Sequence, residues 1–294
     1  MLVLNKENEI YERAIESHRR HNEIHGYEMH VLRRGVTKGY WNKFAYLLSL
    51  VVNELSKPED KRTEWIMWCD ASNLLLNPQI PLEAFLPPPD DQFNHVNFLG
   101  STHAADLSTT AFFLRVSPWS VKLLVKAMAL PMIDQSQDFG VNMDQASLGS
   151  VLNETDFRPS ALYQPHSWYN TLQTSSGIQG KAGDLLIQFP ASLEGARWKY
   201  LAEWLADLEA HPKKWSKAFK DTAYISEIES YWNRIRDVRG VLHDAEDKAS
   251  QLNDDTPEAL ISAMEHVREV VAMEAWNEKL VQEAAARLRD AMSS

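Results

Sequence analysis

Cysteine is almost absent from this chain of 294 residues, and no apolar run is long. The single cysteine, Cys69, excludes an internal disulfide and is compatible with a reducing compartment. Because Cys69 lies inside an apolar run, we expect a buried, inert thiol rather than a nucleophile. No run approaches the roughly 18 apolar residues of a membrane span, and no signal peptide follows Met1. The chain as it stands is therefore expected to be soluble and cytoplasmic, with no membrane partner.

Glycine-rich phosphate loops are also missing, and basic residues are outnumbered. Neither G-x-G-x-x-G, nor the P-loop pattern, nor a G-x-S-x-G elbow occurs among the 11 glycines. A bound nucleotide must therefore be held by other means. Lysine and arginine total 30 against 41 acidic residues, a net charge of −11, which argues against nucleic acid as a partner. A small-molecule substrate is the expected partner.

The first third of the chain alternates between strand and helix patterns. Strands are predicted over 1–5, 27–32 and 64–69, and helices over 7–25 and 40–55. This order is typical of an α/β fold with a mostly parallel sheet flanked by helices. Further strands are expected at 97–100, 111–115 and 185–189, a short helix at 83–85, and helices from Pro118, with Ser117 as N-cap, and over 144–152.

From about residue 195 onward the pattern is almost entirely helical. We predict an α/β domain over 1–210 and a helical hairpin extension over 211–294. The hairpin carries an apolar stripe of Ile261, Met264, Val267 and Val271. Such a stripe ordinarily packs on its own domain, and a homodimer through these helices is the alternative.

Two acidic residues stand where a predicted element ends or begins. Asp70 follows the strand at 64–69, and it either caps the following turn or faces a ligand, since ligands bind outside the carboxyl ends of strands. Asp144 opens a helix, where an acid is ordinary because it complements the helix dipole. Spacing alone does not decide either case.

Three histidines, His18, His21 and His25, share one predicted helix. Their spacing would bring two or three imidazoles to one face, as a metal site requires. No thiol is close in sequence, and Arg19 and Arg20 are unfavourable neighbours for a cation. We therefore interpret these histidines as a solvated polar face.

The order of several motifs resembles one family. The motifs are H-G-Y at 25–27, Y-W-N-K at 40–43, E-W-I-M-W-C-D-A-S at 64–72, L-N-P at 76–78, I-P-L-E at 80–83, F-F-L-R with S-P-W-S at 112–120, M-D-Q-A-S-L at 143–148 and G-D-L-L-I-Q-F at 183–189. In this order and spacing they resemble the galactosyl/mannosyl/xylosyltransferase family of fungal and plant Golgi enzymes. The match runs from about residue 5 to residue 204.

The resemblance implies a GT-A fold, a Rossmann-like α/β domain that binds a UDP- or GDP-linked sugar. In that family a divalent ion, typically Mn²⁺, is held by a D-x-D motif and a histidine on the last strand, and it neutralises the leaving diphosphate. A glutamine of the D-Q block lies near the reacting carbon and is associated with retention of configuration. The resemblance also makes the Golgi lumen the alternative location, if an anchor lies upstream.

This sequence departs from the family at the metal and sugar positions. The D-x-D motif reads Asp70-Ala71-Ser72, the late histidine is Gln188, Ser108 and Thr110 replace an asparagine and a glycine, and His103 replaces an aspartate. No metal site is therefore assigned, although Asp70 remains a weak ligand for Mg²⁺ or Mn²⁺.

The leading hypothesis is a retaining glycosyltransferase with weakened or absent metal dependence. Asp70 and Ser72 would contact the ribose or diphosphate, Asp144 would hold sugar hydroxyls, and Gln145 would face the anomeric carbon. The remaining substrate-binding candidates are Ser108, Thr110, Gln188 and a cation that replaces the metal's charge, namely Lys43, Lys181 or Arg197.

Two other hypotheses remain open. The first is a repurposed GT-A fold that catalyses a different step, such as cyclisation of a natural-product intermediate, with His103 and Asp106 as acid and base. The second is a pseudoenzyme that binds partners through its helical tail.

Overall fold

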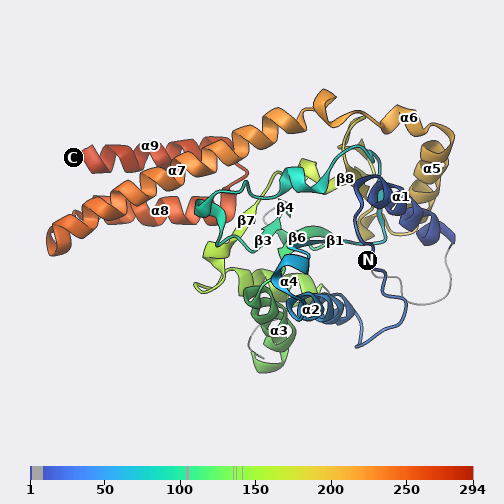
Figure 1. The fold of residues 1–294 in the computed structure, drawn as a ribbon, viewed down its shortest axis with the longest axis horizontal. Helices are drawn as coiled ribbons and strands as arrows, with labels where there is room; N and C mark the ends of the chain where they lie inside the picture. Colours follow the sequence, from blue (N-terminus) through green and yellow to red (C-terminus); the bar gives the residue numbers. More distant parts are fainter. Residues whose placement is uncertain (2–8, 104–105, 135, 137, 141, 294) are drawn as a thin grey trace.

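The computed structural model describes residues 1, 9–103, 106–134, 136, 138–140 and 142–293. It is a mixed α/β protein with a body of strands and helices, from which an arm of long helices extends to one side (Figure 1). Of the strand predicted over 1–5, all but Met1 lies outside the described residues.

In the described part of the chain, the strands of the body form two four-stranded sheets and one hairpin. The first sheet has the order β1-β6-β3-β7, with β1 Trp65–Cys69, β6 Ala111–Arg115, β3 Phe98–Gly100 and β7 Ala161–Tyr163. The second has the order β2-β10-β8-β9, with β2 Asn73–Leu75, β10 Leu186–Gln188, β8 Thr171–Thr174 and β9 Gly177–Ile178. The hairpin pairs β4 Thr102–His103 with β5 Asp106–Leu107.

The prediction of a mostly parallel sheet was wrong. Among the described strands, only β3–β7 and β8–β10 pair in parallel, and the other pairs are antiparallel. The chain passes from β3 to β6 through the β4–β5 hairpin, without the helical crossover that parallel neighbours require. The segment predicted as a strand at 27–32 also differs, since only Leu32 has a strand-like bridge.

Helices cover the sheets as the periodicity predicts. α2 Trp41–Leu55, α3 Pro118–Ile133 and α4 Met143–Leu152 pack around one apolar core with β3 and β6. α1 Glu9–His25 contacts β2 and α5 Ala196–Ala210. The Ser117 cap is confirmed, because its hydroxyl accepts a hydrogen bond from the Ser120 amide. Short 3₁₀ helices occur at η1 Glu59–Lys61, η2 Leu82–Phe85, η3 Asp91–Phe93, η4 Arg158–Ser160, η5 His166–Trp168, η6 Ala191–Leu193, η7 Phe219–Asp221 and η8 Asn253–Asp255.

The histidines of α1 fasten this helix to the chain that follows β1, so their interpretation as a solvated face was wrong. Each imidazole Nε2 hydrogen-bonds to a carbonyl oxygen: His18 to Asn73 at 2.9 Å, His21 to Ile80 at 2.8 Å, and His25 to Pro78 at 3.0 Å. His18 and His21 are buried. Burial lowers the pKa of His18 to about 4, so that its ring is neutral at pH 7.

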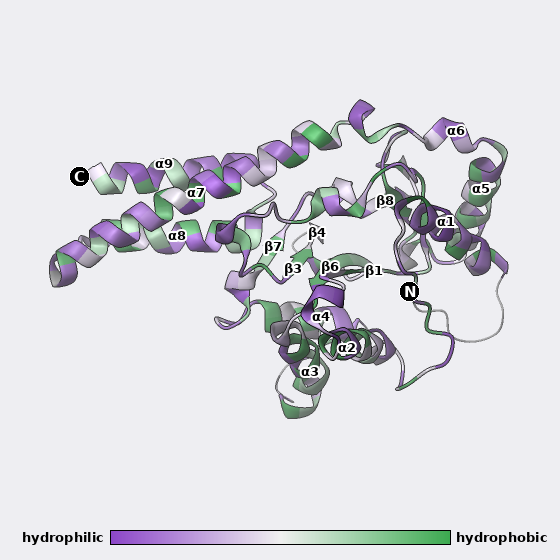
Figure 2. Ribbon diagram, in the orientation of Figure 1, coloured by the Kyte–Doolittle hydropathy of each residue, from purple (hydrophilic) through white to green (hydrophobic). Residues whose placement is uncertain are grey.

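The C-terminal part contains α6 Pro212–Trp215 and three long helices, α7 Tyr224–Leu252, α8 Glu258–Glu274 and α9 Glu278–Ser293, where a two-helix hairpin was expected. Figure 2 shows hydrophilic and hydrophobic residues alternating along this arm. The first turns of α7 belong to the core of the body, because Tyr231 and Trp232 pack with the strand residues. Among the described residues, no helix is long and apolar enough to cross a membrane.

Candidate functional site

The carboxylate of Asp70 lies at the end of β1 and does not cap the turn. The turn is closed by the backbone, with the Asn73 amide donating to the Asp70 carbonyl at 3.0 Å. The carboxylate instead accepts a hydrogen bond from Trp68 Nε1 at 2.8 Å. Its side chain keeps 28% of its surface exposed, so that it is accessible to a ligand.

Lys43, from α2, places its ammonium between two acids. Its Nζ lies 3.2 Å from Asp144 Oδ2 and 3.7 Å from Asp70 Oδ1, and it donates to the Thr109 carbonyl at 3.0 Å. Lys43 is 5% exposed and Asp144 4% exposed. Three elements therefore meet in one buried ion cluster, because an unpaired charge at this depth would be costly.

Gln145 follows Asp144 on α4 but faces elsewhere. Successive helical residues are turned by about 100°, and Gln145 lines a cavity of about 420 Å³ instead of contacting Lys43. Asp106 and Asn142 also line this cavity, and Met273 contributes from α8 of the arm. A volume of this size is within the range of small-molecule sites, about 300–1,000 Å³.

A chain of polar groups runs from β5 and β6 into the body. The hydroxyls of Ser108 and Thr110 donate to Asn170 Oδ1 at 3.1 and 2.9 Å. Asn170 Nδ2 donates to Ser101 Oγ at 2.8 Å, and Ser101 Oγ lies 3.4 Å from His166 Nδ1.

His166 ends this chain of polar groups with an imidazole that burial keeps neutral. The centroid of its ring lies 5.0 Å from that of His103, with the two planes tilted by 33°, and its Nε2 is buried without a hydrogen-bond partner among the described residues. Burial, with a smaller effect of His103, lowers the pKa of His166 to about 4.

Gln188 and Asn73 are opposite each other in the β10–β2 pair. Gln188 Oε1 and Asn73 Oδ1 are both buried, and neither has a hydrogen-bond partner among the described residues. Ser72, next to Asn73, is also buried. Uncharged side-chain oxygens therefore lie at the position where the resemblance places a metal ion.

These residues do not fit a tightly held Mn²⁺ ion. Asp70, the one carboxylate that the resemblance leaves as a metal ligand, already faces the ammonium of Lys43 at 3.7 Å. Neutral oxygens alone are weak ligands for a dication. Among the described residues there is no group of three or more histidine, cysteine, aspartate or glutamate side chains that could hold a metal ion.

The structure brings the predicted residues together in two groups. Lys43, Asp70 and Asp144 form the ion cluster, and Ser108 and Thr110 meet on Asn170. The two groups are adjacent, because Thr109 lies between the two hydroxyl residues and accepts the bond from Lys43. Among the described contacts, none joins His103, Gln145, Lys181 or Arg197 to the ion cluster.

Sequence reasoning missed Asn170 and His166. Each is a single polar residue beside aromatic residues, without a motif that marks it, and only tertiary contacts reveal its part in the polar chain.

Comparison with known proteins adds little to this geometry. The chain matches no protein-family model and no curated protein. One solved structure, a glycosyltransferase involved in the glycosylation of the major capsid of PBCV-1, is similar with a TM-score of 0.49 and 12% identity, over 69% of this chain and 97% of that one.

Proposed function

We propose that this protein is a retaining-type glycosyltransferase with a GT-A-like body, which uses a UDP- or GDP-linked hexose or pentose and depends little on a metal ion. The observation that carries the proposal is the ammonium of Lys43 between Asp70 and Asp144. The motif resemblance at 64–72 and 143–148 supports the assignment of these acids to a sugar-nucleotide site.

Lys43 takes over the charge that the family places in a divalent ion. The departing diphosphate develops negative charge, and a fixed cation beside it lowers the barrier. We place the diphosphate at the carboxyl end of β1, beside Asp70. The exposed carboxylate oxygens of Asp70 accept hydrogen bonds from the hydroxyls of the ribose. Asp144 lies 3.2 Å from the Lys43 ammonium, and we therefore assign it the role of fixing that ammonium.

The cavity lined by Gln145 is the proposed site of the transferred sugar and its acceptor. The amide oxygen of Gln145 is a weak polar group, suited to a reacting carbon that carries developing positive charge. Asp106 and Asn142 supply hydrogen-bonding groups to the same cavity.

The experiment is a thermal-shift and hydrolysis screen with UDP-galactose, UDP-xylose and GDP-mannose at about 1 mM, a concentration that stabilises any protein with a Kd of about 100 μM or below. We expect one donor to raise the melting temperature and to be hydrolysed slowly, in EDTA as well as in Mn²⁺. Absence of both effects for all donors in both conditions contradicts the proposal.

A second candidate is the repurposed fold, and the neighbouring imidazoles of His103 and His166 favour it. His166 carries a buried, unpartnered nitrogen at the end of the chain of polar groups, and His103 lies opposite Asp106 in the β4–β5 hairpin. Such groups suit acid–base chemistry on a substrate that lacks a nucleotide. Activity that survives removal of all nucleotide, and that His166→Gln abolishes, would favour this candidate.

A further inference from the structure

Three basic side chains from separate elements meet where the arm joins the body. Arg239 belongs to α7, His95 lies between η3 and β3, and Arg115 ends β6. Arg239 Nη1 donates a hydrogen bond to His95 Nε2. Arg115 Nη1 donates to the carbonyl of Asn94, the residue before His95, at 2.8 Å. We call Arg115, His95 and Arg239 the basic cluster, and the sequence neighbours of all three are among the described residues.

Negative charge is scarce at the basic cluster, although acidic residues outnumber basic ones by 41 to 30 in the whole chain. Glu64 Oε1 lies 3.4 Å from Arg115 Nη2, and the Glu64 side chain is 72% exposed. The nearby carboxylate of Asp90 is bonded to Arg236 at 2.9 Å. Arg239 forms no ion pair with any carboxylate in the described part of the chain. The region therefore carries a surplus of positive charge.

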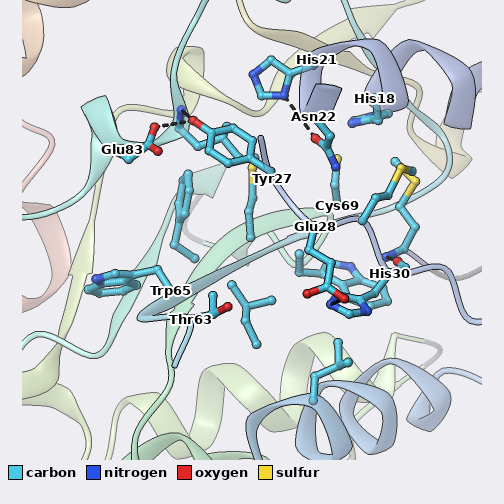
Figure 3. A pocket seen from close by; sticks show the side chains of 18 of the residues that line it. His18, His21, Asn22, Tyr27, Glu28, His30, Thr63, Trp65, Cys69 and Glu83 are labelled. Atoms are coloured by element: carbon cyan, nitrogen blue, oxygen red, sulfur yellow. Dashed lines mark hydrogen bonds and ion pairs between the residues drawn. The ribbon is translucent and has the colours of Figure 1, made fainter. Parts of the chain in front are cut away.

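Both guanidinium groups of the basic cluster are shielded from water. The ring of Trp65, which Figure 3 shows beside the cavity of about 600 Å³ along β1, has its centroid 4.8 Å from the guanidinium carbon of Arg115. The ring of Phe93 lies 5.7 Å from that of Arg239. The Nε atoms of both arginines are buried, with no hydrogen-bond partner among the described residues. A bound anion would stabilise such desolvated cations.

Carbonyl partners do not supply the missing charge. Arg239 Nη1 also donates to the Gln92 carbonyl at 2.8 Å, which satisfies this N–H group but leaves the guanidinium charge uncompensated. Burial lowers the pKa of Arg239 to about 10. The same residue must nevertheless stay charged at pH 7, because that value lies well above neutrality.

The imidazole of His95 responds to this surplus charge. Desolvation, followed by the charges of Arg239 and Arg115, lowers the pKa of His95 to about 4. The ring is therefore neutral at pH 7, as it must be to accept the bond from Arg239 through Nε2. Its side chain keeps an exposed surface, so that a ligand from solvent can reach it. An anion beside the ring would favour its protonated form, which donates through Nε2.

We propose that the basic cluster binds a phosphate group, either free phosphate or the monoester of a small molecule, with Arg115, Arg239 and His95 as its hydrogen-bond donors. Guanidinium groups suit the oxygens of such a group because they offer paired N–H donors. The proposal is independent of the proposed function, since the basic cluster shares no residue with the ion cluster.

The balance of charge favours phosphate over a carboxylate. The guanidinium groups of Arg115, Arg236 and Arg239 against the carboxylates of Glu64 and Asp90 leave one positive charge. Protonation of His95 raises this to two, which a phosphate dianion neutralises and a single carboxylate does not. The side chain of Arg115 is only 19% exposed, which favours a small ligand over the flat surface of a membrane.

The test is an NMR titration of the His95 imidazole in the full chain between pH 4 and pH 8. Sodium phosphate is added up to about 20 mM, with ionic strength held constant by sodium chloride. We expect phosphate to raise the pKa of His95 from about 4 toward its ordinary 6.5. A parallel titration with glucose 6-phosphate distinguishes the two sources of the group, and a response to either supports the proposal.

Three variants localise the binding. Arg239→Gln should weaken the affinity for phosphate at least about tenfold, because it removes one charged donor. Glu64→Gln, at an exposed side chain, should strengthen it by up to about threefold, because a competing carboxylate is lost. Arg268→Gln is the matched control: it removes an arm arginine that is 49% exposed and paired with Glu246, and it should leave the affinity unchanged.

Four results would overturn the proposal. The first is an unchanged pKa of His95 with both phosphates. The second is an equal response to sodium chloride alone, which indicates general screening. The third is an equal loss of affinity in Arg239→Gln and Arg268→Gln, or a loss in the folded Glu64→Gln variant. The fourth is a response to vesicles of phosphorylated lipids with none to either small phosphate, which indicates a membrane surface.

Discussion

Replacing Lys43 with methionine removes the ammonium of the ion cluster while keeping most of the side-chain volume. Asp144, 4% exposed, then loses its ion-pair partner in a buried position. Breaking a buried pair by removing one partner costs about 3–5 kcal/mol. For a chain of this size that corresponds to a fall in melting temperature of roughly 10 °C.

The penalty should depend on pH in a defined direction. Without the ammonium, the carboxylate of Asp144 is buried with an uncompensated charge, and acid relieves that charge in the folded variant. The destabilisation is therefore largest at neutral pH and shrinks as the pH falls.

Urea denaturation of both proteins at pH 7 and pH 5 measures these effects. Lys122→Met, on an exposed position of α3, is the matched control and should stay within about 0.5 kcal/mol of the parent. The double variant Lys43→Met/Asp144→Leu should recover most of the loss, because it removes the uncompensated charge. A loss below about 1 kcal/mol for Lys43→Met, or one that grows at pH 5, would refute the assignment of a buried ion cluster.

Three further predictions concern α1, the second cavity and the arm. The buried His18 ring has a pKa of about 4 against 6.5 in the unfolded chain. The free energy of unfolding therefore falls by up to about 3 kcal/mol as the pH drops from 6.5 toward 4. His18→Gln should flatten this dependence of stability on pH, as measured by urea denaturation across the range. Gln145→Ala should lower the rate of sugar-nucleotide hydrolysis at least about tenfold. The melting temperature should stay unchanged, because the side chain lines a cavity. A loss of donor binding as large as the loss of hydrolysis would contradict this role. The Tyr224 hydroxyl accepts a hydrogen bond from the Leu185 amide and donates one to the Trp168 carbonyl, so Tyr224→Phe should cost about 1–3 kcal/mol in thermal denaturation. Tyr46→Phe, at a hydroxyl with no such bridge among the described residues, should cost less than about 1 kcal/mol. Equal costs would indicate that α7 is not fixed to the body.

Local patterns in the sequence predicted most of the helices. The Ser117–Pro118 start of α3 and the apolar spacing of α2 depend on neighbouring residues, and both are present as expected. The direction of strand pairing was not predictable in this way. A short apolar strand such as β6 has the same pattern in either orientation, and the order of strands depends on contacts between distant segments.

The candidate site was only partly visible in the sequence. Asp70, Asp144 and Lys43 were selected from motifs, but their arrangement around one ammonium depends on tertiary contacts that bring residues of α2, α4 and the end of β1 together. The histidines of α1 show the opposite case. Their spacing described a polar face, yet each ring is held against a carbonyl of the chain after β1, which no local pattern records. A homodimer through the arm stays a prediction.

We propose that Lys43 stands in for a divalent ion at a sugar-nucleotide site. The decisive measurement is isothermal titration of UDP and GDP into the metal-free protein, first in EDTA and then in Mn²⁺. We expect the preferred nucleotide to bind in EDTA with a Kd within about threefold of its value in Mn²⁺. Binding weakened by about a hundredfold or more in EDTA would show that a metal ion, and not Lys43, carries the charge at this site.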